Sequence, residues 1–428
     1  MDSIGQLPTS PVRPWDAIIC TSEAVKANIA VVLEAKLKYL AKETGATKFN
    51  LPEFPVIPLG LNIKNLTAKA DSAAVRKRYN ISEDAIVLLY LGRLSFHAKA
   101  NPYQMYKALN EVAGTVSQEL VLVECGWFST KYIEDSFSSA FSEICRDKVK
   151  RLFVNGTDQE VKKDLLKLSD IFVSLSDNIQ ETFGITPLEA MASGIPVVVS
   201  DWNGYKETVD DQCGYKISSV MPAAGLGSDL INRYALGIDD YDQYLGNVSN
   251  FVSVCQNTLV SRLKALINNK SLRMTIGQNA RQHALSYDWS NIIPQYDELW
   301  RELEKKRKLS SSQSKVIWAE RLDPFKAFST YPSKNLESDD ILYPSQTSLN
   351  QGEKELEKVL GLVVTSYCLP VTGSIQDVME VLNTVSTKGM SVKILLEHFE
   401  DAKKAKYLRI VYWLLKVNLL YYTSSSLK

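Results

Sequence analysis

The sequence has few of the residues that build metal centres and disulfide frameworks. Its 428 residues include six cysteines and three histidines. The cysteines show neither CxxC spacing nor the paired pattern of a small secreted domain, and several lie in apolar runs. Such thiols are typical of reduced, buried cysteines, so we expect a cytoplasmic protein without a metal site built from His and Cys.

The sequence also lacks net charge and a long apolar run. Lys plus Arg and Asp plus Glu each total 49, so the formal net charge is zero. This balance gives no global attraction to nucleic acid or to an anionic membrane, and we do not expect nucleic acid as a partner. No run of about 18 apolar residues and no signal-peptide pattern is present, which predicts a protein at most peripheral to a membrane.

Apolar runs of strand length alternate with helical patterns through the middle of the chain. We predict strands at 85–91, 120–124, 149–154, 171–175 and 196–200, with helices at 103–113, 133–145 and 158–168 between them. Near-continuous apolar strands that alternate with helices are typical of a sheet covered on both faces. The sequence therefore predicts an α/β fold with a doubly wound, parallel, Rossmann-like sheet.

The stretch 171–202 contains the most informative loop. A strand leads into loop 176–185, then into a short helix for which we predict Thr186 as N-cap, Pro187 as first residue and Gly194 as terminator. Parallel sheets bind ligands beyond the carboxyl ends of their strands, where this loop lies. The backbone N–H groups of Phe183 and Gly184 precede the helix and suit an anion.

Two glutamates and two cations are candidate ligand contacts, each with an ordinary alternative. Glu181 could instead be a solvated loop carboxylate, and Glu189 could close a capping box with Thr186. Arg93 and Lys99 follow the strand at 85–91, where a phosphate would lie, or they are two surface cations. The residue types alone leave these interpretations open.

Residues 181–198, ETFGITPLEAMASGIPVV, resemble the E-x7-E signature of retaining, family-4 type glycosyltransferases, also called glycosyl transferases group 1. Those enzymes have a two-domain GT-B fold and use nucleotide-activated sugars. Gly92-Arg93 and Lys99 resemble the family's phosphate-binding residues at the family's spacing. The turn at 58–62 resembles the family's interdomain linker, although Asn62 stands where Asp is common.

This resemblance implies a complete donor site without a cofactor or a metal, because Arg, Lys and a helix dipole can stabilise the leaving diphosphate. The nucleotide-sugar is the donor substrate. The implied roles are a catalytic contact to the sugar from Glu181; phosphate binding by Arg93, Lys99, Phe183, Gly184 and Ile185; ribose binding by Glu189; and base flanking by Val154, Asn155 and Gly156.

The resemblance also divides the chain. It covers about residues 15–307, with 1–50 as the last strand and helix of an acceptor domain and 51–307 as the nucleotide-sugar-binding domain. Residues 218–250 resemble an inserted loop or lid. We predict a linker and irregular segment at 308–352 and a small helical, winged-helix-like module at 353–428. Protein docking or plain structural packing suits that module better than DNA binding, because it has no basic recognition helix.

Most of the family's acceptor domain has no counterpart in the sequence. We therefore expect the donor-binding portion of a retaining hexosyltransferase, which acts on a glycan or lipid-linked acceptor with a separate acceptor-domain protein or within a longer chain. The alternative is a catalytically inactive, truncated relative that binds a nucleotide-sugar or docks a protein. A transcriptional regulator is a third reading, which the neutral charge disfavours.

Overall fold

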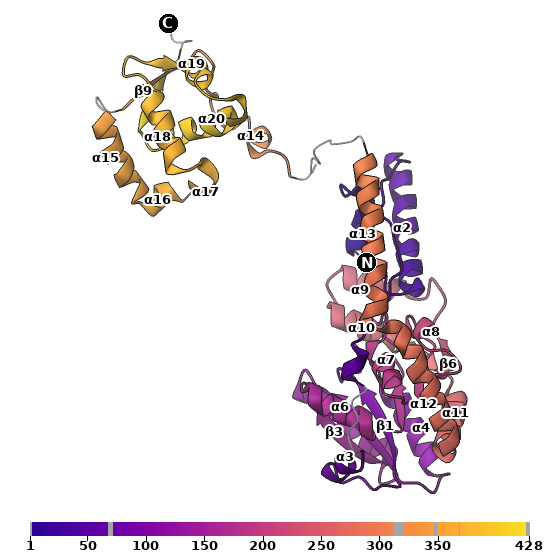
Figure 1. Ribbon diagram of the computed structural model, residues 1–428. Helices are drawn as coiled ribbons and strands as arrows, with labels where there is room; N and C mark the ends of the chain where they lie inside the picture. The colour runs from indigo at the N-terminus through magenta and orange to yellow at the C-terminus, as the bar shows by residue number, and fades with distance from the viewer. Residues whose placement is uncertain (1, 67–71, 311–320, 346–348, 368, 425–428) are drawn as a thin grey trace. The chain divides into compact units, whose positions relative to one another are not determined.

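The computed structural model describes residues 2–66, 72–310, 321–345, 349–367 and 369–424 (Figure 1). The chain forms two compact units, Met1–Trp318 and Ala319–Lys428, and each is described by itself.

The first unit is built on a six-stranded parallel sheet with the strand order β3-β2-β1-β4-β5-β6. The strands are β1 (Ile86–Leu91), β2 (Leu120–Gly126), β3 (Lys150–Asn155), β4 (Ile171–Ser174), β5 (Val197–Ser200) and β6 (Gly214–Ile217). The strand order reverses between β1 and β4, and ligands of doubly wound sheets bind at such a switch point. The prediction of an α/β fold with a doubly wound parallel sheet is confirmed.

Alternate residues of β1 enter two separate cores, one on each face of the sheet. Leu88 packs against one set of helices and Leu89 against the other. The first face carries α4 (Tyr103–Ala113), α5 (Lys131–Cys145) and α11 (Gln256–Asn268); the second carries α3 (Ser72–Arg78), α6 (Gln159–Leu168), α7 (Ile185–Ala192) and α12 (Lys270–Ala284). Burial on both faces explains why these strands are apolar throughout.

The N-terminal segment packs on the first unit without joining its sheet. It contains α1 (Asp2–Gln6) and the long helix α2 (Glu23–Thr44), whose N-cap Ser22 accepts a hydrogen bond from the Val25 amide. Two isolated parallel bridges, Ala17 to Glu53 and Cys20 to Val56, connect its extended parts. Helix α13 (Trp289–Leu309) covers this segment through apolar contacts with Ile57.

The prediction of a loop at 218–250 is wrong for most of that segment. It contains α9 (Ser228–Ala235) and α10 (Tyr241–Ser249), and β7 (Ser219–Val220) pairs with β8 (Ser253–Val254) at its base. Asp240 forms a capping box with Gln243, and the rings of Tyr234 and Tyr244 stack. These local contacts stabilise the two helices.

The second unit combines short helices with a three-stranded antiparallel sheet of order β10-β9-β11. Its elements are α14 (Pro324–Ala327), β9 (Ile341–Pro344), α15 (Leu349–Leu360), α16 (Val363–Ser366), α17 (Leu369–Thr372), α18 (Ile375–Thr384), β10 (Met390–Ser391), α19 (Val392–Glu397), α20 (Asp401–Lys416) and β11 (Leu420–Thr423). The prediction of an irregular segment at 308–352 is wrong at β9, because Leu342 is fully buried in this unit's core.

Candidate functional site

Three glycines form the floor of the candidate site, where β1, β2 and β3 end. Gly92 donates its N–H to the carbonyl of Cys125 at 3.0 Å, and Gly156 donates to the carbonyl of Gly126 at 2.9 Å. A Cβ on Gly126 would lie 1.9 Å from the carbonyl oxygen of Gly92. Only glycine permits this approach, which places the end of β2 against the loop after β1.

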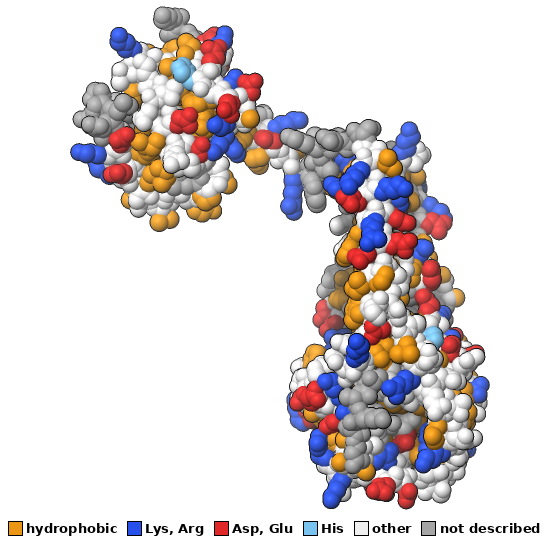
Figure 2. Space-filling view, in the orientation of Figure 1, with side chains coloured by type: hydrophobic (Ala, Val, Ile, Leu, Met, Phe, Trp, Pro, Cys, Tyr) orange, Lys and Arg blue, Asp and Glu red, His pale blue; other side chains and the backbone are white. Residues whose placement is uncertain are grey.

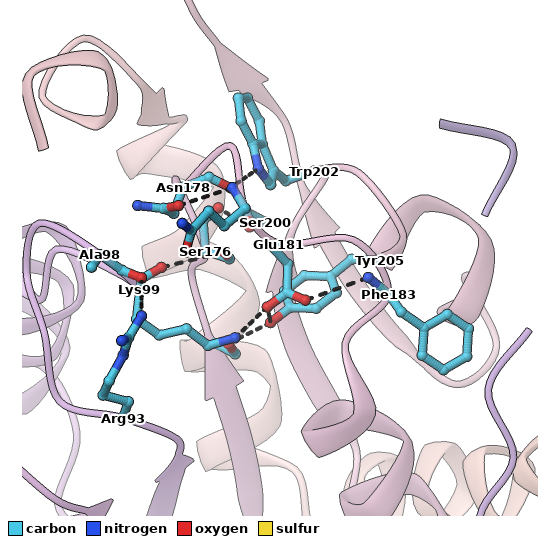
Figure 3. A network of polar contacts seen from close by, with 12 residues as sticks. Arg93, Ala98, Lys99, Ser176, Asn178, Glu181, Phe183, Ser200, Trp202 and Tyr205 are labelled. Carbon is cyan, nitrogen blue, oxygen red and sulfur yellow. Dashed lines mark hydrogen bonds and ion pairs between the residues drawn. The ribbon is translucent and has the colours of Figure 1, made fainter. Parts of the chain in front are cut away.

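Glu181 lies across the switch point from β1 and is held by three partners (Figure 3). The ammonium of Lys99 lies 2.5 Å from its Oε2, and the Tyr205 hydroxyl lies 3.4 Å from the same oxygen. The Phe183 amide donates to Oε1 at 3.4 Å. Because only 8% of the Glu181 surface is exposed, the alternative of a solvated loop carboxylate is wrong.

Tyr205 is a member of this network that the sequence analysis missed. It comes from α8 (Tyr205–Thr208), is fully buried, and also shares a 2.9 Å hydrogen bond with Ser174. Burial first, and then the charge of Glu181, raise the pKa of its phenol well above the usual value, so the hydroxyl stays a neutral donor. The sequence signals no link between this tyrosine and Glu181.

The loop between Arg93 and Lys99 brings both predicted cations to the same edge of the sheet. The Arg93 guanidinium donates to the carbonyl of Ala98 at 2.8 Å, which closes the loop on itself. Lys99 is one-quarter exposed and points at Glu181, so a bound phosphate would compete with that carboxylate for the ammonium. The structure thus places Lys99 and Glu181 together and keeps Arg93 in the same loop.

Asn178 fixes the loop that carries Glu181. Its amide donates to the carbonyl of His97 at 3.0 Å and to the Ser249 hydroxyl at 3.2 Å, and its backbone carbonyl accepts from the indole of Trp202 at 2.9 Å. Asn178 therefore connects the cation loop, the glutamate loop and α10. The sequence analysis missed it, since a turn-forming Asn signals only local contacts.

Glu189 pairs with Lys162 of α6, a residue that the sequence analysis did not select. The two side chains are 12% and 19% exposed, and Lys162 Nζ lies 2.6 Å from Glu189 Oε1. The other oxygen, Oε2, is buried and has no hydrogen-bond partner among the described residues. Burial raises the pKa of Glu189 and the Lys162 charge opposes that rise.

The predicted capping box between Thr186 and Glu189 is wrong. Helix α7 begins at Ile185, and its N-cap is Gly184, which has the left-handed φ of +90°. That conformation starts the helix two residues earlier than predicted and places Thr186 inside its first turn. Gly194 follows the last turn with φ +81°, as expected of a helix terminator. Glu189 is therefore free to face Lys162.

The predicted base-flanking residues lie where β3 ends. The side chain of Val154 is partly buried and packs against a core of the sheet. Asn155 accepts a hydrogen bond from the Thr157 amide at 3.0 Å, and Gly156 packs against β2. The base-flanking role of these three residues stays a prediction.

Asp177 is a buried carboxyl that the sequence analysis also missed. It is 9% exposed, and its Oδ2 accepts a hydrogen bond from the Asn101 amide at 3.2 Å. Burial raises its pKa to about 7, although the backbone hydrogen bond opposes the rise. Asp177 therefore titrates near neutral pH beside the loop that carries Lys99.

Two further features concern metals and membranes. Among the described residues, one group could hold a metal ion: ligand atoms of Asp210, Cys213 and His283 lie within 4.8 Å of one another, and none of these residues belongs to the predicted donor site. No helix in the described ranges is long and apolar enough to cross a membrane.

Part of the chain, including most of the candidate site, is similar to a known sequence family. Residues 71–221 match the family Glycosyl transferases group 1. An uncharacterized glycosyltransferase of Methanocaldococcus jannaschii is 32% identical over 174 residues, which cover 39% of this chain and 42% of that protein. A D-inositol 3-phosphate glycosyltransferase of Salinispora arenicola is 25% identical over 251 residues, which cover 56% of this chain and 47% of that protein.

Solved structures give more distant likenesses. Sucrose-phosphate synthase of Thermosynechococcus elongatus has a TM-score of 0.46 and 20% identity, covering 71% of this chain and 61% of that one. Anabaena HepE, solved in complex with UDP-glucose, has a TM-score of 0.42 and 17% identity, covering 68% and 64%. The chain spans about half the length of the curated relatives it matches. The match to the Glycosyl transferases group 1 model over residues 71–221 and the curated relatives, which are named glycosyltransferases, thus agree with each other.

Proposed function

We propose that the first unit binds a nucleotide-activated sugar and forms the donor-binding half of a retaining, family-4 type hexosyltransferase with a GT-B fold. The observation that carries this proposal is the state of Glu189. A carboxylate that is nearly buried, paired through one oxygen and unpartnered at the other is costly unless a ligand completes its hydrogen bonds. Sugar and ribose hydroxyls are donors of the required kind.

The network around Glu181 supports the same proposal. A nucleoside diphosphate at the end of β1 would draw Lys99 away from Glu181 and onto its phosphate oxygens. Glu181, released from this ion pair, would accept hydrogen bonds from hydroxyls of the sugar. Arg93 and the amides of Gly184 and Ile185, at the N-terminus of α7, would add further donors to the diphosphate.

Transfer then breaks the bond between the anomeric carbon and the distal phosphate oxygen. A new bond forms from that carbon to an acceptor hydroxyl, which gives its proton to the departing diphosphate, and the sugar keeps its anomeric configuration. Arg93 and Lys99 stabilise the charge that develops on the leaving group without a metal ion. We assign acceptor binding to a separate acceptor-domain protein that presents a glycan or lipid-linked hydroxyl in the cytoplasm.

A second candidate function is a non-catalytic module that binds a nucleotide-sugar and docks a protein. The second unit favours it, because Val363, Val364, Tyr367 and Val371 are 70% to 87% exposed. Figure 2 shows hydrophobic side chains gathered on the surface of this unit. Exposed apolar groups of this density mark interaction surfaces.

Calorimetry with UDP, GDP, ADP and their hexose conjugates tests donor binding. We expect one of them to bind, and Arg93→Ala and Glu189→Ala to weaken that binding by about tenfold or more, as loss of a charge-assisted hydrogen bond does. Arg78→Ala is the matched control, because Arg78 pairs with Asp164 on the exposed side of α3. Absence of binding by every nucleotide would contradict the proposal.

An assay for sugar transfer separates the two candidate functions. The transferase proposal expects product when the chain is combined with an acceptor-domain protein, and loss of product in Glu181→Gln. Nucleotide-sugar binding without transfer under every such combination would favour the docking module.

A further inference from the structure

Lys162 forms an ion pair with Glu189, but the proposed donor site assigns it no role. It comes from α6, which follows β3 and the base-flanking loop, whereas Glu189 comes from α7, which follows β4. The 2.6 Å ion pair between them therefore joins the two helices that follow the loops predicted to hold a nucleoside. Both side chains are mostly buried, so water screens the pair only weakly.

The surroundings of the pair define what Lys162 does to Glu189. Lys162 is the charged group that acts on the carboxylate, and it opposes the rise in pKa that burial imposes on Glu189. The Lys162 charge also acts on the thiol of Cys125, whose pKa burial raises to about 11. Cys125 is thus neutral near neutral pH.

The geometry of the carboxylate completes the argument. Oε1 faces the Lys162 ammonium, and Oε2 is buried without a partner among the described residues. A carboxylate held through one oxygen cannot rotate freely, so its second oxygen keeps one direction. Preorganised acceptors of this kind lose little conformational entropy when a ligand binds.

We propose that Lys162 is a positioning residue for donor binding: its ion pair with Glu189 Oε1 keeps this carboxylate ionised and directs Oε2 at a ribose hydroxyl of the bound nucleoside diphosphate. This inference rests on the proposed function of the site. Lys162 itself does not touch the ligand. Its effect passes through Glu189, which accepts a hydrogen bond from the 2′-hydroxyl or the 3′-hydroxyl of the ribose.

Affinity measured against pH tests the inference. The probe is whichever of UDP, GDP and ADP the unmodified chain binds best, at about pH 6 and about pH 9. In Lys162→Met, burial acts on Glu189 unopposed, so the pKa of Glu189 rises further and a larger fraction of the carboxyl is protonated at the lower pH. We expect affinity about tenfold below that of the unmodified chain at the lower pH, with most of the difference recovered at the higher pH.

Two variants make the comparison specific. Lys162→Arg keeps the charge and should restore the affinity at the lower pH. Lys163→Met is the matched control, because Lys163 is the next residue of α6 and pairs with the exposed Glu160. It should bind as the unmodified chain does. The inference would be overturned if Lys162→Met bound the nucleotide as tightly as the unmodified chain, or if its affinity fell equally at both pH values.

A double-mutant cycle separates positioning from general destabilisation. In a Glu189→Gln background, Lys162→Met should weaken nucleotide binding no further, since the carboxylate it acts on is gone. An equal loss in both backgrounds would show that Lys162 acts elsewhere, and thermal melting of each variant reports whether it is folded. If the unmodified chain binds no nucleotide, the proposed function fails; if it binds and Lys162→Met binds equally well, this inference alone fails.

Discussion

Gly184 is a residue of the site at which a single added methyl group would meet a buried side chain. It caps α7 with φ +90°, and a Cβ added there would lie 2.0 Å from Cε1 of Tyr205. Tyr205 is fully buried and contacts both Ser174 and Glu181, so its ring has no free space into which to move. We therefore predict that Gly184→Ala destabilises the first unit and disturbs Glu181.

The loss of stability in Gly184→Ala has two contributions, which a control variant can separate. A left-handed backbone costs a non-glycine residue about 1–2 kcal/mol, and overpacking a filled core costs about 1–3 kcal/mol more. Gly225 has a similar φ of +97° but nothing within 4 Å of the Cβ position. Gly225→Ala should show the backbone cost alone, and Gly184→Ala should exceed it by about 1–3 kcal/mol.

Urea unfolding followed by tryptophan fluorescence measures this difference. The transition of the first unit gives the free energy of unfolding, and the transition of the second unit is an internal reference that neither substitution should change. Gly184→Ala should also weaken nucleotide-sugar binding, whereas Gly225→Ala should not. Equal free energies of unfolding for the two variants, to within about 0.5 kcal/mol, would refute the packing argument.

Three other predictions follow from buried charges and caps. Arg76 donates to four backbone carbonyls and to Asp170, so Arg76→Ala should lower the free energy of unfolding by about 3–5 kcal/mol in a urea titration, whereas the exposed Arg78→Ala should change it little. Asp177 has a folded-state pKa of about 7, above its ordinary 3.8, so the folded state holds an extra proton between these values and stability falls as pH rises through that window. Asp177→Asn should therefore reduce the fall in the free energy of unfolding between acidic and neutral pH by about 2–4 kcal/mol, measured by urea unfolding at several pH values. An unchanged pH profile would contradict the raised pKa of Asp177. The Glu207 carboxylate accepts the first two amides of α2, so Glu207→Gln should speed hydrogen exchange of those amides by about twofold to fivefold, and unchanged rates would argue against this cap.

Local features of the sequence predicted local structure well. The alternation of apolar strands and helices predicted the parallel sheet, and the helix predicted at 158–168 is α6, which Asp158 caps. Thr186 failed as a cap because Gly184, two residues earlier, adopts a conformation that starts the helix first. The segment 218–250 also failed as a loop, because its two helices depend on a capping box and on stacked tyrosines.

The sequence by itself selected the candidate residues of the site, and the tertiary structure decided which of them meet. Glu181, Glu189, Arg93 and Lys99 were selected from motif and spacing, because charged residues beyond strand ends mark the ligand edge of a parallel sheet. Alternation of strands and helices does not specify the order of strands in the sheet. Only the placement of β4 beside β1 brings Lys99 to Glu181 across 82 residues, and only the packing of α6 on α7 brings Lys162 to Glu189.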